Sequence, residues 1–529
     1  MFLTLLIACQ RPGVSLLEAG ETGAQSLRIS AEALPACGDP SARNTLGPYS
    51  VYSGADWDAQ PIAEEEPEAA WGVAVEDFDG DGLYDIFLPN FAQDRLYLGR
   101  PGPEFIDASA TLLPFEPATP SLSVAAADAD GDGAIDLGLG RRGAAALYLN
   151  QGDGHMALQP ALSTHVADDR NVSWGDLDGD GLPELFIGTF YLLGFPDDPR
   201  HNELYHNDGG GRFSDISDLL GPVARNTPAN AGGFLDIDRD GDQDLYVVND
   251  KPQAGFLSVL LENDGAGNLR YDENAHGLDV AVQGMGFAAG DLNGDGLDEL
   301  VITGWSELFL RMSAPDGVWF EAADAMGLRT DEQRVVAWAA DFVDIDLDGD
   351  LDLLVSYGPD FDEFGTIGGL DVVNPAVQPM GLYINEGGFF VEESAAWGLD
   401  TPGIYRGFSV ADLNRDGYPD LVVPELMGPA RVYLSRCGDG RSLAVNLRMP
   451  SPNTRALGAR VRVSAGGQVM ERTVLSGTTN ASSSSPTELL FGLGEAEQVE
   501  ELEVLWPDGA VSTLTNIAAD QVLTLTRPE

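Results

Sequence analysis

The chain has 529 residues, which is too long for one ordinary domain, and its composition is strongly acidic. Lys and Arg total 28 against 86 Asp and Glu, so the net charge at neutral pH is −58. A chain with this charge repels nucleic acid and anionic lipid, which excludes both as partners. The sequence contains no run of about 20 apolar residues that could span a membrane.

The first nine residues end in Leu6-Ile7-Ala8-Cys9, which resembles a bacterial lipobox with Cys9 as the lipidated residue. The basic region that normally precedes the apolar run is missing, and the run is short. Either the true start lies upstream or the match is accidental. We expect residues 1–9 to be a signal segment and residues 10–36 to be a tether.

A nine-residue loop then recurs seven times, beginning with Asp77-Phe-Asp79-Gly-Asp81-Gly-Leu-Tyr-Asp85. Oxygen side chains occupy positions 1, 3, 5 and 9, and position 6 is always Gly, which permits the tight turn that brings these side chains to one centre. The backbone carbonyl of position 7 is a further candidate ligand. Ligand sets made only of oxygen favour Ca²⁺ over Zn²⁺ or copper, so we expect up to seven Ca²⁺ ions. The predicted metal-site residues are Asp77, Asp79, Asp81, Leu83 and Asp85; Asp128, Asp130, Asp132, Ala134 and Asp136; Asp176, Asp178, Asp180, Leu182 and Glu184; Asp236, Asp238, Asp240, Asp242 and Asp244; Asp291, Asn293, Asp295, Leu297 and Glu299; Asp344, Asp346, Asp348, Asp350 and Asp352; and Asp412, Asn414, Asp416, Tyr418 and Asp420.

These loops differ from an EF-hand, which needs a bidentate Glu at position 12. Position 12 is apolar in all seven copies, from Leu88 in the first to Val423 in the last, and β-rich runs follow each loop. The sites are also expected to be unequal. Asn replaces Asp at position 3 of the fifth and seventh loops, which should weaken binding, whereas Asp242 and Asp350 add an acid at position 7.

The loop starts are 51, 48, 60, 55, 53 and 68 residues apart, and most units contain four short β-rich segments. Such a period indicates a propeller, whose blades are roughly 40–50 residues long. We therefore predict an all-β fold, with a seven-bladed β-propeller over residues 71–438. The repeats resemble the FG-GAP (VCBS) repeats of integrin α-subunit propellers. That resemblance implies that each loop joins the first two strands of a blade and binds Ca²⁺.

The seventh blade lacks an obvious fourth strand, and residues 37–70 contain a candidate for it in Tyr49-Ser50-Val51-Tyr52. If Cys9 is lipidated, Cys37 and Cys437 remain as one pair in an oxidising compartment. A disulfide between them would covalently link the N-terminal segment to the seventh blade and so stabilise the closed ring. The alternative is two unpaired thiols of no consequence.

Little in the repeats indicates catalysis. The five His residues show no zinc-ligand spacing, and His201 and His206 are interpreted as surface or hydrogen-bonded polar groups. No nucleophile elbow, Walker loop or dinucleotide motif is found. Trp71, Trp174, Trp338 and Phe287 precede their loops at similar offsets. We interpret them as core residues; aromatic platforms for sugars are the alternative.

Residues 439–529 have a different pattern, with alternating polar and apolar residues that indicate a small β-sandwich or barrel. Gly458-Ala459-Arg460-Val461, Phe491-Gly492-Leu493-Gly494 and Trp506-Pro507-Asp508-Gly509 resemble the ASPIC/UnbV domain. A propeller followed by this domain is the layout of the cartilage acidic protein family. The absence of a Cys-rich EGF-like module makes the sequence similar to bacterial members.

We therefore expect a non-enzymatic, extracytoplasmic calcium-binding protein, secreted or held at the cell surface as an outer-membrane lipoprotein. Extracellular calcium modules bind with Kd values of about 10⁻⁴–10⁻³ M, which the cytosol cannot satisfy. Ca²⁺ is expected to be mainly structural, the alternative being a direct bridge to a partner. The expected partner is an extracellular protein or glycan, and the chain is expected to be a monomer. A polysaccharide-binding lectin and a Ca²⁺-dependent hydrolase are the alternative functions.

Overall fold

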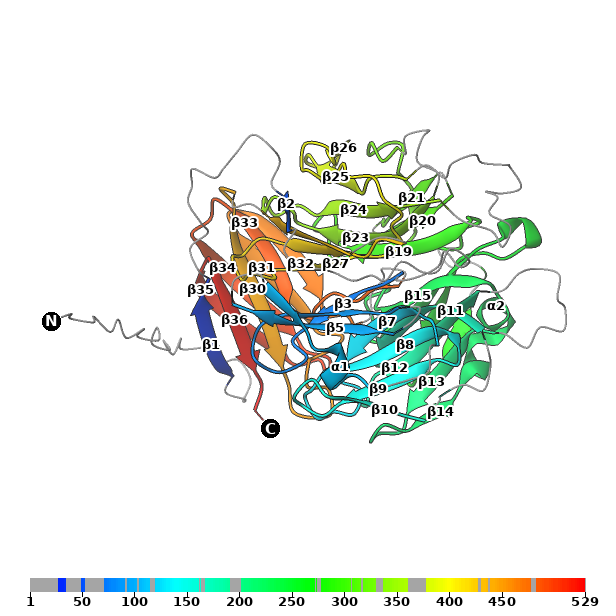
Figure 1. Ribbon diagram of the computed structural model, residues 1–529. Coiled ribbons are helices and arrows are strands. Elements are labelled where there is room, and N and C mark those ends of the chain that lie inside the picture. Colours follow the sequence, from blue (N-terminus) through cyan, green and yellow to red (C-terminus); the bar gives the residue numbers. More distant parts are fainter. Residues whose placement is uncertain are drawn as a thin grey trace.

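The computed structural model describes residues 27–34, 49–52, 71–90, 93–101, 104–114, 119–160, 162, 167–190, 201–271, 273, 277–305, 307–314, 317–329, 336–359, 377–426, 430–435, 438–476 and 482–528. These residues are almost entirely β-structure (Figure 1). Their helical elements are short: α1 (Ser109–Leu112), α2 (Gly221–Arg225), η2 (Ser217–Leu220) and η3 (Pro252–Ala254). None of the helices in the described part is long and apolar enough to cross a membrane.

The strands outside the C-terminal region follow the chain in antiparallel units of four; five of these units are separate sheets, and the second and third join through β8 and β11 into one eight-stranded sheet. The first four units are β3 (Ala74–Glu76), β4 (Asp85–Leu88), β5 (Arg95–Arg100) and β6 (Glu104–Asp107); β7 (Ser121–Ala127), β8 (Asp136–Gly143), β9 (Ala146–Asn150) and β10 (Met156–Leu158); β11 (Ala167–Gly175), β12 (Glu184–Phe190), β13 (Glu203–Asn207) and β14 (Phe213–Asp215); and β15 (Ala229–Leu235), β16 (Asp244–Asn249), β17 (Val259–Asn263) and β18 (Leu269–Tyr271). The remaining three units are β19 (Gly284–Gly290), β20 (Glu299–Gly304), β21 (Leu308–Met312) and β22 (Phe320–Glu321); β23 (Ala337–Val343), β24 (Asp352–Tyr357), β25 (Gly381–Asn385) and β26 (Phe390–Glu392); and β27 (Ser409–Ala411), β28 (Asp420–Val423), β29 (Arg431–Ser435) and β2 (Tyr49–Tyr52).

The first strands of the first six units lie beside one another in order, and β27 of the last unit contacts β3 of the first. Close packing between units requires small residues in these strands. A Cβ added at Gly175 would overlap Phe234 of the next unit, and one at Gly232 would overlap Phe186 of the preceding unit. The result is the propeller-type, all-β architecture that the sequence predicts, with one acidic loop between the first two strands of each unit.

Strand β2 is the fourth strand of the last unit and pairs with β29 in the register Tyr49↔Ser435 to Tyr52↔Val432. This is the position that the sequence analysis assigns to it. The cysteines Cys9, Cys37 and Cys437 lie outside the described residues. The proposed lipid anchor and disulfide therefore stay predictions.

The C-terminal region is a sandwich of two four-stranded sheets, β1-β36-β30-β33 and β32-β31-β34-β35. Trp506, Phe491 and Val461 are among the buried residues of the core between them. The strands of this sandwich are β30 (Arg441–Arg448), β31 (Arg460–Ala465), β32 (Gln468–Thr473), β33 (Leu489–Gly494), β34 (Gln498–Leu505), β35 (Val511–Ala518), β36 (Gln521–Thr526) and β1 (Arg28–Ala33).

Strand β1 differs from the tether expected over residues 10–36. It pairs antiparallel with β36 from Arg28↔Thr526 to Ala33↔Gln521, and Figure 1 shows it in blue at the edge of the red C-terminal strands. Ile29 is buried and Ala31 packs against the same core. Ile29 and Ala31 alternate with polar residues, as in a strand with one face on the core, so the segment forms the edge strand of the sheet. Its partner, β36, lies about 490 residues further along the chain.

Candidate metal centres

The first aspartate closes the turn through its Oδ2 atom in six of the seven acidic loops. The N–H of the position-6 Gly donates to this oxygen at 3.0 Å in the first loop (Gly82 to Asp77) and at 2.8 Å in the seventh (Gly417 to Asp412). The second, third, fifth and sixth loops have the same bond. The position-6 Gly has a φ between 86° and 103° in all seven loops, which is the left-handed region that favours Gly.

Positions 3 and 5 each accept a hydrogen bond from a backbone N–H two residues further on. Asp79 accepts from Asp81 at 3.2 Å, and Asp81 accepts from Leu83 at 2.9 Å. The same pair of bonds occurs in the other six loops. These bonds hold the alternating side chains on the inner side of the turn, as the spacing predicts. The position-7 residues donate to position 5, and the use of their carbonyls as ligands stays a prediction.

The position-9 carboxylates are completely buried, with 1% or less of each residue exposed. One oxygen accepts the position-2 N–H, and the other accepts an N–H from the end of the third strand. For Asp85 these donors are Phe78 and Gly99, both at 2.8 Å. The equivalent bonds occur in the other six loops. Position 9 therefore ties each loop to the third strand as well as facing its centre.

Burial determines the electrostatics of these carboxylates. It raises the pKa of Asp85, Glu184 and Glu299 to about 7 and that of Asp244 to about 8, because the charged form loses hydration. Neighbouring loop carboxylates raise these values further, while backbone N–H donors lower them. A cation at the centre would favour the charged forms.

The carboxylates converge in the first four loops. Three oxygens, one from each side chain, lie within 4.8 Å of one another in the sets Asp77/Asp79/Asp85, Asp128/Asp130/Asp136, Asp176/Asp178/Asp180 and Asp236/Asp238/Asp240.

A test of whether these loops fit a cation comes from the second oxygen of position 1. In Asp77, Asp176, Asp236 and Asp344 the Oδ1 atom is buried and has no hydrogen-bond partner among the described residues. A buried carboxylate oxygen without a donor is costly, and a hard cation would satisfy it. In the other three loops Oδ1 accepts a loop N–H, for example from Gly131 to Asp128 at 2.9 Å. The loops thus fit Ca²⁺ chemically and are unequal.

Asp242, the acid at position 7 of the fourth loop, lies in a partly buried, negatively charged environment. The Oδ1 atom of Asp242 is also buried without a partner, and burial raises its pKa to about 6, with further contributions from Asp240, Asp238 and Asp236. The negative charges of its loop therefore act on Asp242, and its use as an additional ligand stays a prediction.

Three features of the loops were missed in the sequence. Asn150, Asn207 and Asn263, at the ends of third strands, each donate to a carbonyl in their own loop and to one in the preceding loop. Asn207, for example, donates to Pro183 at 3.1 Å and to Ala129 at 2.7 Å. The His206 side chain is partly exposed and its Nδ1 lies in hydrogen-bond contact with Glu184 at 2.9 Å, which agrees with its interpretation as a surface or hydrogen-bonded group; that this partner belongs to the third loop was not predicted. A Tyr-x-Asn ending of the third strand was the available signal for Asn150 and Asn207, whereas Asn263 follows Leu261 and lacks it.

The third missed feature is that the C-terminal sandwich covers the face with the acidic loops. Thr454 bonds to the position-1 Asp128, and the Gly492 N–H donates to the position-1 Asp344 at 3.0 Å. Position 4 is not Gly in three loops. Two of these residues, Arg239 and Arg415, have positive φ and form ion pairs with sandwich residues, Glu471 at 2.6 Å and Glu488 at 2.7 Å.

A serine-rich segment of the sandwich inserts between the first strands of the propeller. The Ser484 N–H donates to the Val73 carbonyl at 2.8 Å, and the Ser484 carbonyl accepts from Val75 at 3.1 Å. The Ser482 carbonyl accepts from Val124 at 3.1 Å. Ser482, Ser483 and Ser484 are at most 3% exposed, so this segment is part of the folded centre.

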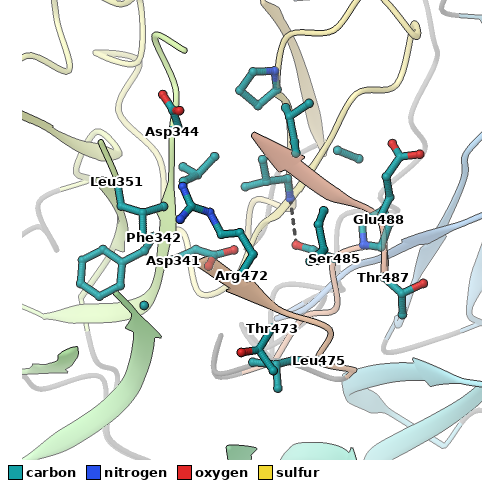
Figure 2. Close-up of a pocket in the computed structure, with 18 of the residues that line it drawn as sticks. Asp341, Phe342, Asp344, Leu351, Arg472, Thr473, Leu475, Ser485, Thr487 and Glu488 are labelled. Atoms are coloured by element: carbon teal, nitrogen blue, oxygen red, sulfur yellow. Dashed lines mark hydrogen bonds between the residues drawn. The ribbon is translucent and has the colours of Figure 1, made fainter. Parts of the chain in front are cut away.

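A cavity of about 200 Å³ remains between the sandwich and the propeller. Figure 2 shows Arg472 of β32 extending into it towards Asp341 and Phe342 of β23, with Glu488 and Thr487 on the opposite side. Burial raises the pKa of Asp341 to about 7 and lowers that of Arg472. The cavity therefore has charged groups among a largely apolar lining and is shared by both parts of the chain.

The aromatic residues that precede the loops are in the core. Trp174, Trp338 and Phe287 are at most 2% exposed, and Trp71 is 4% exposed. Trp71 and Trp338 pack edge to face with their ring centroids 5.5 Å apart. This burial agrees with their interpretation as core residues.

Comparison with known sequences defines the class of protein. The FG-GAP-like repeat model matches residues 77–139, 130–187 and 236–302, and the ASPIC and UnbV model matches residues 449–529. The chain therefore contains FG-GAP-like repeats of propeller type followed by an ASPIC/UnbV domain.

The chain is also a distant homologue of cartilage acidic protein 1. It is 22% identical to the Xenopus tropicalis protein over 507 residues, which cover 87% of this chain and 72% of that protein. The human protein matches over a shorter region, 41% identical over 81 residues, or 14% of this chain and 12% of that protein. This relationship agrees with the resemblance inferred from the sequence.

Solved structures that match the chain include BBS1N in complex with ARL6DN, with a TM-score of 0.43, 10% identity, and coverage of 71% of this chain and 95% of that chain. Rhamnogalacturonan lyase YesW has a TM-score of 0.40, 15% identity, and coverage of 78% and 76%. TM-scores below 0.5 are too low to indicate a shared activity.

Proposed function

We propose that this protein is an extracytoplasmic, non-enzymatic interaction protein whose acidic loops bind Ca²⁺ mainly for structural purposes. The observation that carries the proposal is the buried Oδ1 atom of Asp77, Asp176, Asp236 and Asp344, which no donor among the described residues satisfies. A hard cation in each loop would satisfy that oxygen and neutralise the clustered carboxylates.

The structural role follows from the connections of each loop. Each loop joins the first two strands of its unit, and its position-9 carboxylate bonds the third strand, as Asp85 does with the Gly99 N–H. A cation that draws the four side chains together would therefore stabilise three strands at once. Without the cation, the carboxylates repel one another and the hairpin is less stable.

The proposal of a non-enzymatic role rests on how the buried acids are used. The carboxyl groups with pKa values raised to about 7, such as Asp85, Glu184 and Glu299, are those that complete the loops and accept backbone N–H donors. Their raised pKa values have burial as the main cause. The loops account for these perturbed acids without any catalytic role.

The proposed location and partner follow from the cation. Loops of modest affinity need the calcium concentrations found outside the cytosol, and the Leu-Ile-Ala-Cys9 segment suits export with a lipid anchor. The proposed partner is an extracellular protein or glycan that binds the exposed surface of a monomeric propeller.

The test is the number of Ca²⁺ ions bound, measured by native mass spectrometry and calorimetry. The wild-type protein is expected to bind close to seven ions, and Asp77→Asn is expected to bind one fewer. Asp153→Asn is the control, because Asp153 is an exposed acid outside the loops. Binding of no more than two ions, or equal numbers in wild type and Asp77→Asn, would contradict the proposal.

A further inference from the structure

The third acidic loop has a nitrogen donor beside its oxygens. The His206 Nδ1 atom lies 2.9 Å from Glu184 Oε1 and 3.7 Å from Asp178 Oδ2. One ligand atom from each of Asp178, Glu184 and His206 falls within 4.8 Å of the other two. Glu184 is at position 9 and Asp178 at position 3 of this loop, so His206 adds an imidazole to an oxygen-based site.

Strand register shows what is special about this unit. Leu185 pairs with Tyr205 in the third unit as Leu137 pairs with Tyr148 in the second, so His206 occupies the position of Leu149. By the same pairing the equivalent residues in the other units are Leu98, Glu262, Met312, Ile384 and Leu434. The third unit is therefore the one that supplies an imidazole at this position.

The surroundings of the imidazole suit a metal ligand. An ion bound at Nδ1 leaves the ring proton on Nε2, and Asp208 Oδ1 lies 3.8 Å from Nε2. A carboxylate that faces the non-ligating nitrogen is the usual way in which proteins orient a metal-binding His. The His206 side chain is 32% exposed, so the ion can enter from solvent.

A second set of oxygens meets in the same loop. Asp176, Asp178 and Asp180 form a cluster of the type seen in the other loops, and Asp176 Oδ1 is buried without a partner among the described residues. Asp178 belongs to both sets. The loop can therefore offer an oxygen-only set on one side and a mixed nitrogen and oxygen set on the other.

We propose that Asp178, Glu184 and His206 bind a divalent transition-metal ion of the Zn²⁺ class in preference to Ca²⁺. Imidazole suits Zn²⁺ and its first-row neighbours, whereas Ca²⁺ takes oxygen ligands. Zn–N and Zn–O bonds are about 2.0–2.2 Å long, so ligand atoms 2.9 and 3.7 Å apart lie within reach of a single ion. This inference extends the proposed cation-binding role of the loops.

The test is a calorimetric titration of the full chain with Zn²⁺ in buffer that contains saturating Ca²⁺ and no chelator. The wild-type protein is expected to bind one Zn²⁺, and His206→Leu is expected to lose at least about 10-fold in affinity. Leu is the residue at this register in the first, second and seventh units, so the fold should tolerate it. The control is His155→Leu, because His155 also lies beside an acid, Asp153, but outside the loop; this variant should retain the site.

A variant that should gain a zinc site provides a second, independent test. Leu149→His places an imidazole at the same register beside Asp130 and Asp136, and it should add a second Zn²⁺. Co²⁺ in place of Zn²⁺ should give visible absorption bands of nitrogen ligation that His206→Leu abolishes. Equal Zn²⁺ affinity in wild type and His206→Leu, or no Zn²⁺ binding by wild type, would overturn the inference. Ca²⁺ counted in the same samples separates this failure from a failure of the calcium proposal.

Discussion

The first aspartate of each loop uses its two oxygens differently. In Asp77 the Oδ2 atom accepts the Gly82 N–H at 3.0 Å, while Oδ1 is buried without a partner among the described residues. Burial raises the pKa of Asp77, and the charges of Asp81 and Asp79 raise it further. The side chain therefore shapes the loop in the absence of metal, but at an electrostatic cost.

Because of this difference between the two oxygens, we expect the effect of Asp77→Asn on the free energy of unfolding to depend on Ca²⁺ and to reverse when Ca²⁺ is added. In EDTA the variant should be as stable as wild type or more stable, because the amide oxygen can keep the Gly82 bond and the repelled charge is gone. In saturating Ca²⁺ it should be less stable by about 1–3 kcal/mol, since one ion is lost. Chemical unfolding in both buffers measures this. A variant that is destabilised equally in both buffers would contradict the account.

Asp341 provides a pH-dependent prediction away from the metal ligands. Its folded-state pKa of about 7 lies above the value of about 4 in an unfolded chain. Between these pH values the folded state holds a proton that the unfolded state has lost, so this group lowers the free energy of unfolding as pH rises from about 4 to 7. Above pH 7 the full cost of the buried charge is present.

Asp341→Asn removes that cost. The variant should be more stable than wild type by about 1–2 kcal/mol at pH 8, with less than half of that gain at pH 5. Urea unfolding of both proteins at the two pH values is the measurement. An equal gain in stability at both pH values, or a loss of stability at pH 8, would show that the ionised Asp341 carboxylate does not destabilise the folded state.

At the scale of elements, neighbouring units are connected through their loops as well as their cores. The Asn207 side chain, at the end of β13, donates to carbonyls in the third and second loops. It is 1% exposed, so both carbonyls would lose a buried partner if the amide were removed. This arrangement recurs at Asn150 and Asn263 and makes each loop support the next.

Asn207→Ala is therefore expected to reduce stability by about 2–4 kcal/mol, because two buried carbonyls lose their donor. Asn268→Ala is the comparison: Asn268 is exposed and bonds to Asp264 within its own turn, so its loss should cost less than about 1 kcal/mol. Unfolding in Ca²⁺ buffer measures both. If the two variants lost similar amounts of stability, the hydrogen bonds of Asn207 would not be shown to connect neighbouring units.

How much the sequence predicts depends on how local each feature is. The acidic loops and the strands around them follow from residue spacing within nine or ten positions, and the all-β propeller-type fold follows from their repetition. The role of β1 could not be predicted in this way, because its partner β36 is at the other end of the chain. His206 was missed because its contact with Glu184 arises from strand register rather than from a spacing motif.

At the scale of the whole molecule, the C-terminal sandwich is joined to the propeller at its centre and over its acidic loops. Backbone bonds link Ser484 to Val73 and Val75, and Glu488 forms an ion pair with Arg415 of the seventh loop. Loop conformation and docking of the sandwich are thus physically connected. We expect the two parts to unfold together.

Gly72→Ala tests this connection, because a Cβ at residue 72 would overlap the Ser482 carbonyl. The variant should unfold in two transitions where the wild type unfolds in one. Gly188→Ala is the matched control: it lies on β12, and its Cβ would meet Asn171, Phe186 and Ala229 at 3.3–3.6 Å, which requires shifts of only a few tenths of an ångström. A single unchanged transition for Gly72→Ala would contradict the coupling.

The most direct measurement of the central claim is a thermal melt of the purified chain in excess EDTA and then across a Ca²⁺ titration. If the acidic loops are structural calcium sites, the melting temperature should rise until nearly seven ions are bound, with about 2.7 kcal/mol from each site filled at 100 times its Kd. No rise, or saturation after one or two ions, would contradict the claim that calcium holds the propeller together.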